Sequence, residues 1–406
     1  MSKKLHIPEG LRVVTLPSDS PVAYCGIAVH AGTRHELPGE EGLAHFCEHL
    51  TFKGTQRRTA MRIINEIEGL GGELNAFTNK GDTVFYCAIL REHLRKAIDV
   101  LTDIVFCSTY PQAEVEKESE VVCDEIESYE DSPAELIYDE FENILFEGHP
   151  LGHNILGTRE RVRSYTSDDV RRFTKKWYRP ENCVLFCSSP TPSPSRGGEG
   201  SSYTDDEKTA KEVFTPLPSA GGVEGETIIR NRGTHQAHVM LGTRAYAASD
   251  DRRWALYLLN NILGGPCLNS RLNLSLRERH GLVYSVDSTM TSYSDTGLWT
   301  VYFGCDPDDI NRCCRLVRRE LDRLMQKPLS FAQLRAAKRQ LQGQLAIACD
   351  NREQYTLDFA RTYLHTGHGR TLADVMAHID TLTSADLQQC AQQLFAAERL
   401  TTLIYK

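Results

Sequence analysis

One order of predicted elements occurs twice along the chain, and this repeat restricts the fold more than any other feature. In each half, hydrophobic periodicity predicts two helices, the second stopped by glycine, then two strands and a further helix. The predicted ranges are 42–55, 59–70, 73–78, 83–90 and 92–105 in the first half, and 252–263, 270–280, 284–290, 298–304 and 308–325 in the second. The repeat is one of architecture, and it indicates two units of similar structure.

The remaining predicted elements extend both halves. Runs rich in β-branched and aromatic residues predict strands, and longer periodic runs predict helices. The further strands are expected at 11–16, 22–31, 183–187, 227–229, 237–243 and 400–405, and the further helices at 113–129, 133–146, 167–177 and from 330 to about 397. We expect the first two strands to be a pair joined by residues 17–20, and Ser167 to cap its helix.

This mixture of strands and helices indicates an α+β fold with two homologous domains, each a mostly antiparallel sheet covered by helices. A chain of 406 residues is too long for one ordinary core and fits about two domains. We place the domains at 1–216 and 225–406, because the residues between them have the composition of a linker. The stretch 188–200 is rich in Pro, Ser and Gly, so a mobile loop is expected there.

Three titratable residues stand close together in the first predicted helix. His45 and His49 are four residues apart, so their side chains lie on one face, one turn above the other. Two imidazoles in that arrangement can reach one metal ion, the geometry that zinc uses. Glu48 flanks the same face and can touch a metal-bound water without being a ligand. This H-x-x-E-H order is typical of the inverzincin zinc peptidases.

A catalytic zinc site also needs a third protein ligand. The acidic helix at 113–129 offers Glu118 and Glu125, which are two turns apart on one face, near the side where Val122 packs inward. The spacing leaves open which of the two would bind a metal. It also permits a plainer interpretation, in which these are solvated residues of amphipathic helices.

With these residues the chain resembles the pitrilysin-like zinc peptidases (family M16), which include pitrilysin, insulysin and the mitochondrial processing peptidase. It is similar to the short two-domain type, represented by the β subunit of the processing peptidase and by bacterial homologues. The resemblance implies that Glu125, 76 positions after His49, is the third ligand of one zinc ion per chain. It implies that Glu118 hydrogen-bonds a ligand histidine and supports its orientation.

A second stretch, 71–78, looks like the substrate edge strand of the same family. An edge strand has unpaired backbone groups, so an extended peptide can add to it. The resemblance implies that Asn75 and the backbone of Ala76 contact the substrate and that Phe77 lines the cleft. The alternative for Phe77 is a place in the core.

A third stretch, 276–284, resembles a conserved segment in the second half of the family. The resemblance implies that Arg277 and Tyr284 grip substrate carbonyls or stabilise the reacting oxygen. The alternatives are a surface helix charge for Arg277 and a core aromatic for Tyr284.

The function implied is that of a zinc-dependent endopeptidase, a hydrolase. Glu48 would be the general base on zinc-bound water and would then pass the proton to the leaving amine. The resemblance implies that a two-domain chain forms half of a clamshell, so that two subunits would enclose a chamber for peptides or unfolded segments. We expect a homodimer in which Arg277 and Tyr284 serve the zinc of the partner chain; a heterodimer with a related subunit is the alternative.

Charge and composition argue against other classes of protein. The net charge of −9 disfavours nucleic acid, and no run of eighteen apolar residues predicts a membrane span. No apolar core follows the basic residues at the start, which argues against a secretory signal. The 13 cysteines are odd in number and form no C-x-x-C pairs, which indicates a reducing, cytoplasmic compartment.

Three other interpretations stay open. The main one is a non-catalytic structural subunit of the same family, and the zinc content of the purified protein would distinguish it. The second is a zinc hydrolase with a non-peptide substrate. The third is a processing peptidase that needs a different partner chain.

Overall fold

The computed structural model describes residues 7–189 and 225–406, so the predicted linker and most of the predicted loop at 188–200 lie outside the described residues. The chain divides into two compact units. The first comprises the described parts of 1–123, 155–217 and 351–370, and the second those of 124–154, 218–350 and 371–406. The division passes through one continuous helix, α4 (Gln112–Glu130).

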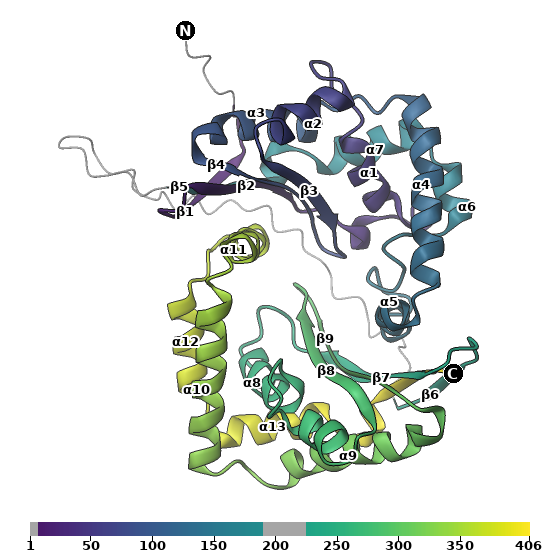
Figure 1. The fold of residues 1–406 in the computed structure, drawn as a ribbon, viewed down its shortest axis with the longest axis vertical. Helices are drawn as coiled ribbons and strands as arrows, with labels where there is room; N and C mark the ends of the chain where they lie inside the picture. The colour runs from purple at the N-terminus through teal and green to yellow at the C-terminus, as the bar shows by residue number, and fades with distance from the viewer. Residues whose placement is uncertain (1–6, 190–224) are drawn as a thin grey trace, which may run out of the picture. The chain divides into compact units, whose positions relative to one another are not determined.

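The first unit is built on a five-stranded sheet in the order β1-β5-β2-β4-β3 (Figure 1). Its strands are β1 (Arg12–Pro17), β2 (Val22–Val29), β3 (Glu73–Thr78), β4 (Thr83–Leu90) and β5 (Cys183–Ser189). Strands β1 and β5 are parallel, and the other neighbours are antiparallel. The expected direct pairing of the first two strands is wrong, because β5 returns from far along the chain and lies between them. Strand β3 is at the edge of the sheet, as predicted.

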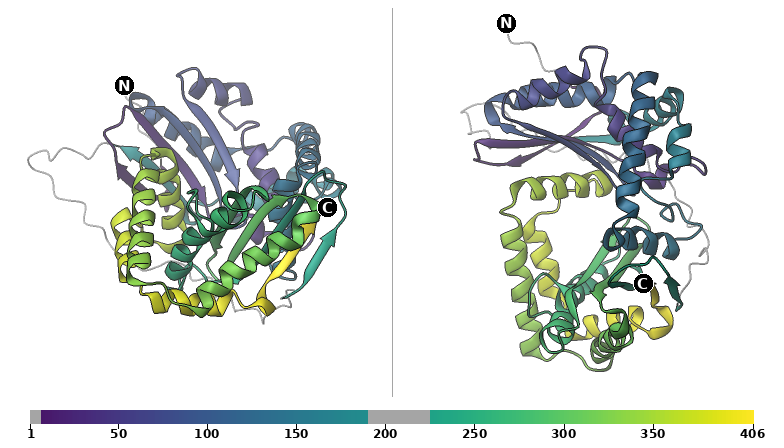
Figure 2. Two further views of the ribbon diagram at one scale, coloured as in Figure 1. Left: turned by 60° about the horizontal axis from the view of Figure 1, so that its bottom comes forward. Right: turned by 45° about the vertical axis from the view of Figure 1, so that its right-hand side comes forward.

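Helices cover both faces of this sheet (Figures 1 and 2). They are α1 (Leu43–Thr51), α2 (Ala60–Glu68), α3 (Leu94–Cys107), the first part of α4, α6 (Arg159–Ser164), α7 (Ser167–Trp177) and α11 (Arg352–Thr366). Helix α3 packs on β2 and β4, and α11 covers the opposite face. There Leu357, Ala360 and Leu364 are buried against Val184 and Phe186 of β5.

The second unit repeats this sheet order with β6-β10-β7-β9-β8. Its strands are β6 (Thr227–Arg230), β7 (Ala237–Ala245), β8 (Val283–Ser292), β9 (Gly297–Cys305) and β10 (Thr401–Tyr405). Only β6 and β10 are parallel, as only β1 and β5 are in the first sheet. Its helices are α5 (Pro133–Leu145), α8 (Arg253–Gly264), α9 (Ile310–Gln326), α10 (Phe331–Ala348), α12 (Leu372–Thr381) and α13 (Ser384–Leu394), with a π-helical turn at Asn273–Glu278. The predicted α+β fold with two similar architectures is confirmed.

Each half of the sequence gives one helix to the unit formed mainly by the other half. Helix α5 belongs to the second unit, where Leu136, Ile137 and Phe141 form a core with Met240 and Tyr405. Helix α11 belongs in turn to the first unit. The assignment of two domains to 1–216 and 225–406, the second carrying Arg277 and Tyr284, stays a prediction.

Local details agree with the sequence within a few residues, with one difference at a helix start. The cap of α7 is Thr166 and not Ser167: the Thr166 hydroxyl accepts a hydrogen bond from Asp169 N, and the Asp169 side chain bonds back to Thr166 N. This reciprocal pair satisfies two helix N–H groups, which a cap one residue later would not do. Among the described helices, none combines the length and the apolar character that crossing a membrane requires.

Candidate metal centre

Helix α1 begins at a tightly constrained point. Its cap, Gly42, has a φ of 89°, and a Cβ atom there would lie 2.6 Å from Leu156 O. Only glycine fits both conditions without strain. The buried Glu36 carboxylate then accepts hydrogen bonds from Gly42 N (3.0 Å) and Ala44 N (2.7 Å), so the first turn is held by charge-assisted bonds. This start fixes the rotation of α1 about its axis, and with it the direction of the histidines.

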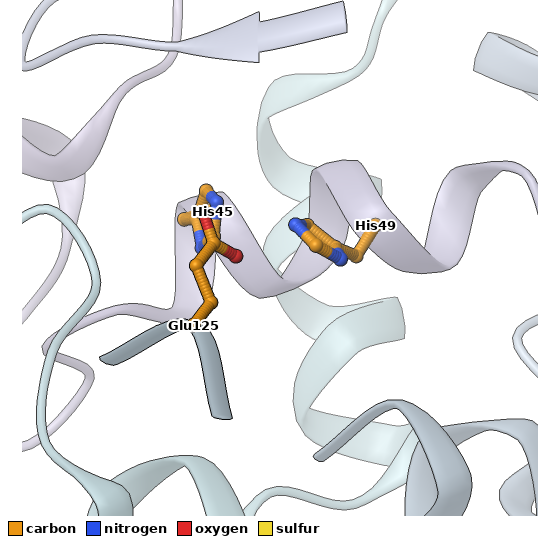
Figure 3. Close-up of side chains that lie close together, drawn as sticks. All are labelled: His45, His49 and Glu125. Atoms are coloured by element: carbon orange, nitrogen blue, oxygen red, sulfur yellow. The ribbon is translucent and has the colours of Figure 1, made fainter. Parts of the chain in front are cut away.

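The structure brings His45, His49 and Glu125 together (Figure 3). One potential ligand atom from each lies within 4.8 Å of the others. The two imidazole centroids are 4.6 Å apart and the rings are inclined by 64°. His45 is buried, His49 is half-buried and Glu125 is exposed, so the cluster is open to solvent on the side of the carboxylate.

These three residues fit a catalytic zinc ion by their chemistry. Two imidazoles and one carboxylate are a donor set that zinc uses in hydrolytic enzymes, with a fourth position left for water or substrate. No other group of three or more His, Cys, Asp or Glu side chains in residues 7–189 and 225–406 converges in this way. The assignment of the three as ligands is made below as part of the proposed function.

Glu118 lies two turns before Glu125 on α4 and contacts the Nδ1 atom of His49. Its Oε1 is 3.0 Å from His49 Nδ1, and its Oε2 is 2.6 Å from Lys53 Nζ. Burial alone would raise the pKa of Glu118, but the hydrogen bonds from His49 and Lys53 outweigh it and lower the pKa. An ionised carboxylate only accepts, so His49 Nδ1 is the donor in this contact.

Glu48 is buried beside the histidines and is held by the end of the edge strand. It is 8% exposed, and its Oε2 accepts a hydrogen bond of 2.6 Å from the hydroxyl of Thr78. Thr78 is the last residue of β3, a strand that packs against α1. The candidate general base is therefore hydrogen-bonded to the same strand that is expected to bind substrate.

The residues expected to bind substrate on β3 face different directions. Asn75 is exposed, Ala76 is half-buried, and both lie on the edge strand of the sheet. The Phe77 ring is half-buried against the α11 face, 6.0 Å from the Tyr86 ring and 5.8 Å from the Arg361 guanidinium. Phe77 thus packs at the periphery of this core, while one edge of β3 has no neighbouring strand in the sheet.

Arg277 and Tyr284 lie together in the second unit. Arg277 is in the π-helical turn, and its guanidinium is 5.8 Å from the centre of the Tyr284 ring. Tyr284 is 85% exposed, which is unusual for so large an aromatic residue and excludes the core position considered from the sequence. The Arg277 side chain is 41% exposed, with Glu278 3.8 Å away.

Sequence reasoning missed three residues that build this region. Thr78 donates a hydrogen bond to Glu48, Lys53 forms an ion pair with Glu118, and Glu36 accepts hydrogen bonds from the first turn of α1. Lys53 could have been found, since it is four residues after His49 and the sequence predicts a helix over both; in the structure α1 ends at Thr51, just before Lys53. Thr78 and Glu36 reach their partners through the fold, and no short-range pattern indicates them.

Comparisons with known families match most of the chain. Residues 12–159 match a family profile described as "Insulinase (Peptidase family M16)", and residues 164–341 match one described as "Peptidase M16 inactive domain". The histidine and glutamate residues of the cluster are all in the first match. The H-x-x-E-H order occurs once in the sequence, also in the first match.

Similar proteins cover the chain almost from end to end. A protein of Streptomyces coelicolor named as an uncharacterized zinc protease is 34% identical over 97% of this chain and 87% of its own length. The Bacillus subtilis protein named as an uncharacterized zinc protease, YmxG, is 31% identical over 100% of this chain and 98% of its own. The crystal structure of a Helicobacter pylori protease shares the fold, with a TM-score of 0.85 at 22% identity over 98% of this chain and 97% of that one.

Proposed function

The chain belongs to peptidase family M16, and from that premise we propose that it is a zinc-dependent endopeptidase that hydrolyses peptides or unfolded segments. The observation that carries the proposal is the convergence of His45, His49 and Glu125 within 4.8 Å, with Glu48 buried next to them. Relatives of similar length are named zinc proteases, which supports the same chemistry.

His45, His49 and Glu125 would hold the metal, one ion per chain, and Glu118 would support the orientation of His49 through their hydrogen bond. A zinc ion bound there would supply Lewis acidity and make a water molecule acidic near neutral pH. Glu48 would accept the proton of the attacking water and later deliver it to the leaving amine. The burial of its side chain on α1 supports this role, since a carboxylate in a water-poor site keeps its orientation between the two transfers.

The substrate would bind as an added strand along β3. The backbone of Ala76 and the exposed Asn75 lie on this edge, and main-chain hydrogen bonds there would bind a peptide without demanding one sequence. Arg277 and Tyr284 are assigned to substrate carbonyls or to the reacting oxygen. Their mutual contact and the exposure of Tyr284 support a role toward a ligand rather than in packing.

The assembly proposed is a dimer, with a homodimer preferred because one chain carries both the metal cluster and the Arg277–Tyr284 pair. In it these two residues would act on the zinc of the partner chain, and two subunits would enclose a chamber. A cytoplasmic location is proposed from the 13 cysteines, all of which are free thiols. Sedimentation of the active protein tests the assembly: a fully active monomer would contradict it.

The decisive experiment is Glu48→Gln. The variant should keep one zinc per chain and lose peptide hydrolysis by several orders of magnitude, because the amide cannot accept the proton. Glu68→Gln is the matched control, since Glu68 is exposed at the end of α2. Hydrolysis is followed by mass spectrometry of a peptide library, with and without a chelator. An unchanged rate in Glu48→Gln would refute the mechanism, and the absence of zinc in the purified protein would favour a structural subunit.

A further inference from the structure

Thr78 is the feature near the metal cluster that the proposed mechanism does not yet use. It is the only fully buried residue of β3, whose other residues are half-buried or exposed. Its hydroxyl donates to Glu48 Oε2 at 2.6 Å, and both side chains are less than 10% exposed. A short, water-excluded bond to a carboxylate is among the stronger hydrogen bonds in proteins.

We infer that Thr78 is a positioning residue, which orients the Glu48 carboxyl group through the hydrogen bond to its Oε2. The inference rests on the proposed function, in which Glu48 accepts and then returns a proton. It assigns the bond with Thr78 to Glu48 Oε2.

The Thr78 hydroxyl also contacts a second buried hydroxyl, that of Thr83. Thr78 Oγ1 also lies 3.2 Å from Thr83 Oγ1, and the Thr83 hydroxyl donates to Ala31 O at 2.9 Å. Thr78 and Thr83 thus form a chain of buried contacts that runs from Glu48 to the Ala31 carbonyl.

The strand end that carries Thr78 is held in place on its far side. The following turn is closed by Asn79 N donating to Asp82 O (2.8 Å) and Asn79 Nδ2 donating to Asp82 Oδ1 (2.9 Å). The Asp82 carboxylate in turn accepts from Arg361 Nε at 3.0 Å and lies 2.7 Å from His365 Nε2, both on α11. Thr78 is thus placed by a rigid turn and not by a mobile loop.

The test is the pair Thr78→Val and Thr78→Ser, measured beside Glu48→Gln with a fluorogenic peptide chosen from the library digest. Valine keeps the shape and the strand preference but has no hydroxyl, so kcat should fall about 10- to 100-fold while KM and zinc content stay within about twofold. Serine restores the hydroxyl and should return kcat to within about threefold of the parent.

A matched control separates positioning from stability. Thr102→Val also deletes a buried hydroxyl that donates to a backbone carbonyl, but on α3, and it should reduce stability without reducing kcat. If Thr78→Val does not fold, Thr78→Cys replaces it; the thiol is a weak donor, and kcat should still fall by at least about threefold.

The outcomes separate two failures. Parental kcat in the valine or cysteine variant, or a serine variant as slow as the valine variant, would overturn the role of Thr78. A fully active Glu48→Gln would instead overturn the proposed function, whatever the threonine variants do.

Discussion

Replacing Asp82 by asparagine tests how the first unit holds α11, the helix that it takes from the second half of the sequence. Asp82 is 1% exposed and contacts three side chains, Arg361, His365 and Asn79. Asparagine has the same shape, but it lacks the charge and presents an amide group toward neighbours that are donors. Arg361 would keep its charge and lose its partner.

The expected cost follows from burial. Removing one partner of a buried ion pair costs about 3–5 kcal/mol. The Arg361 side chain is 35% exposed and that of His365 27%, so water replaces part of the lost interaction, and we expect the lower end, about 3 kcal/mol. At 1.36 kcal/mol per factor of ten this is about a 100-fold change in the local unfolding equilibrium.

Amide hydrogen exchange reports the local unfolding equilibrium of each unit separately, through amides that belong to that unit. Protection of the β4 amides should fall about 100-fold in Asp82→Asn, and protection of the β9 amides, in the second unit, should stay the same. Asp168→Asn, which changes an 89% exposed carboxylate on α7, is the control and should alter neither. Unchanged β4 protection, or an equal loss in both strands, would refute the reasoning.

The pH dependence of the effect has a definite sign. Burial raises the pKa of Asp82, but the hydrogen bond with His365 and the charge of Arg361 outweigh it, so the pKa lies well below its usual value. A carboxylate with a lowered pKa stabilises the fold above the unfolded-state pKa of about 4 and loses this contribution as the pH falls below it. The difference in β4 stability between the parent and Asp82→Asn should therefore be fully present at pH 7 and smaller at pH 3.

Three further predictions follow from other contacts. Glu118→Gln should weaken zinc binding about 10- to 100-fold in competition with a chromophoric chelator, and an unchanged affinity would contradict its supporting role. Burial lowers the pKa of His30 to about 4 and that of His35 to about 3, so the unfolded chain binds more protons in acid than the folded chain does. The free energy of unfolding, measured by urea titration, should therefore fall as the pH is lowered from 6.5 to 4. A flat profile over this range would contradict the prediction. Leu364→Ala removes a buried contact of α11 and should cost about 2–5 kcal/mol, against less than about 0.5 for the exposed Leu37→Ala; equal losses would show that α11 is not packed there.

Elements that depend on neighbouring residues were predictable from the sequence. The bounds of β3 and β4 agree with the predicted strands, because alternation and the intervening Asn79–Asp82 turn act over a few residues. Helix α1 was predicted from the spacing of its polar and apolar residues, and the structure places it at Leu43–Thr51. The repeat of architecture was visible for the same reason, since each copy is a series of local patterns.

Arrangements that depend on distant residues were not predictable in this way. The position of β5 between β1 and β2 depends on a segment more than 150 residues further along the chain. The placement of α11 depends on a complementary surface formed by β5 and β2, and the helix itself carries only an ordinary amphipathic pattern. In the metal cluster, the i, i+4 histidines were evident, but choosing Glu125 over Glu118 needed the family resemblance.

The two units show how little separates the proposed catalytic arrangement from a structural one. In the second unit, Ser288 of the edge strand β8 donates at 2.6 Å to Asn260 Oδ1 of α8, a contact of the same kind as that between Thr78 and Glu48. An edge-strand hydroxyl thus binds an acceptor on the neighbouring helix in both units. An amide cannot take up a proton near neutral pH, so the second contact can only hold α8 against its sheet. The first contact holds a carboxylate, which can exchange protons, and it lies next to the two histidines. The sheet order therefore supplies this placement in both units, and in the first unit His45, Glu48 and His49 of α1, together with Glu125 of α4, would supply the proposed chemistry.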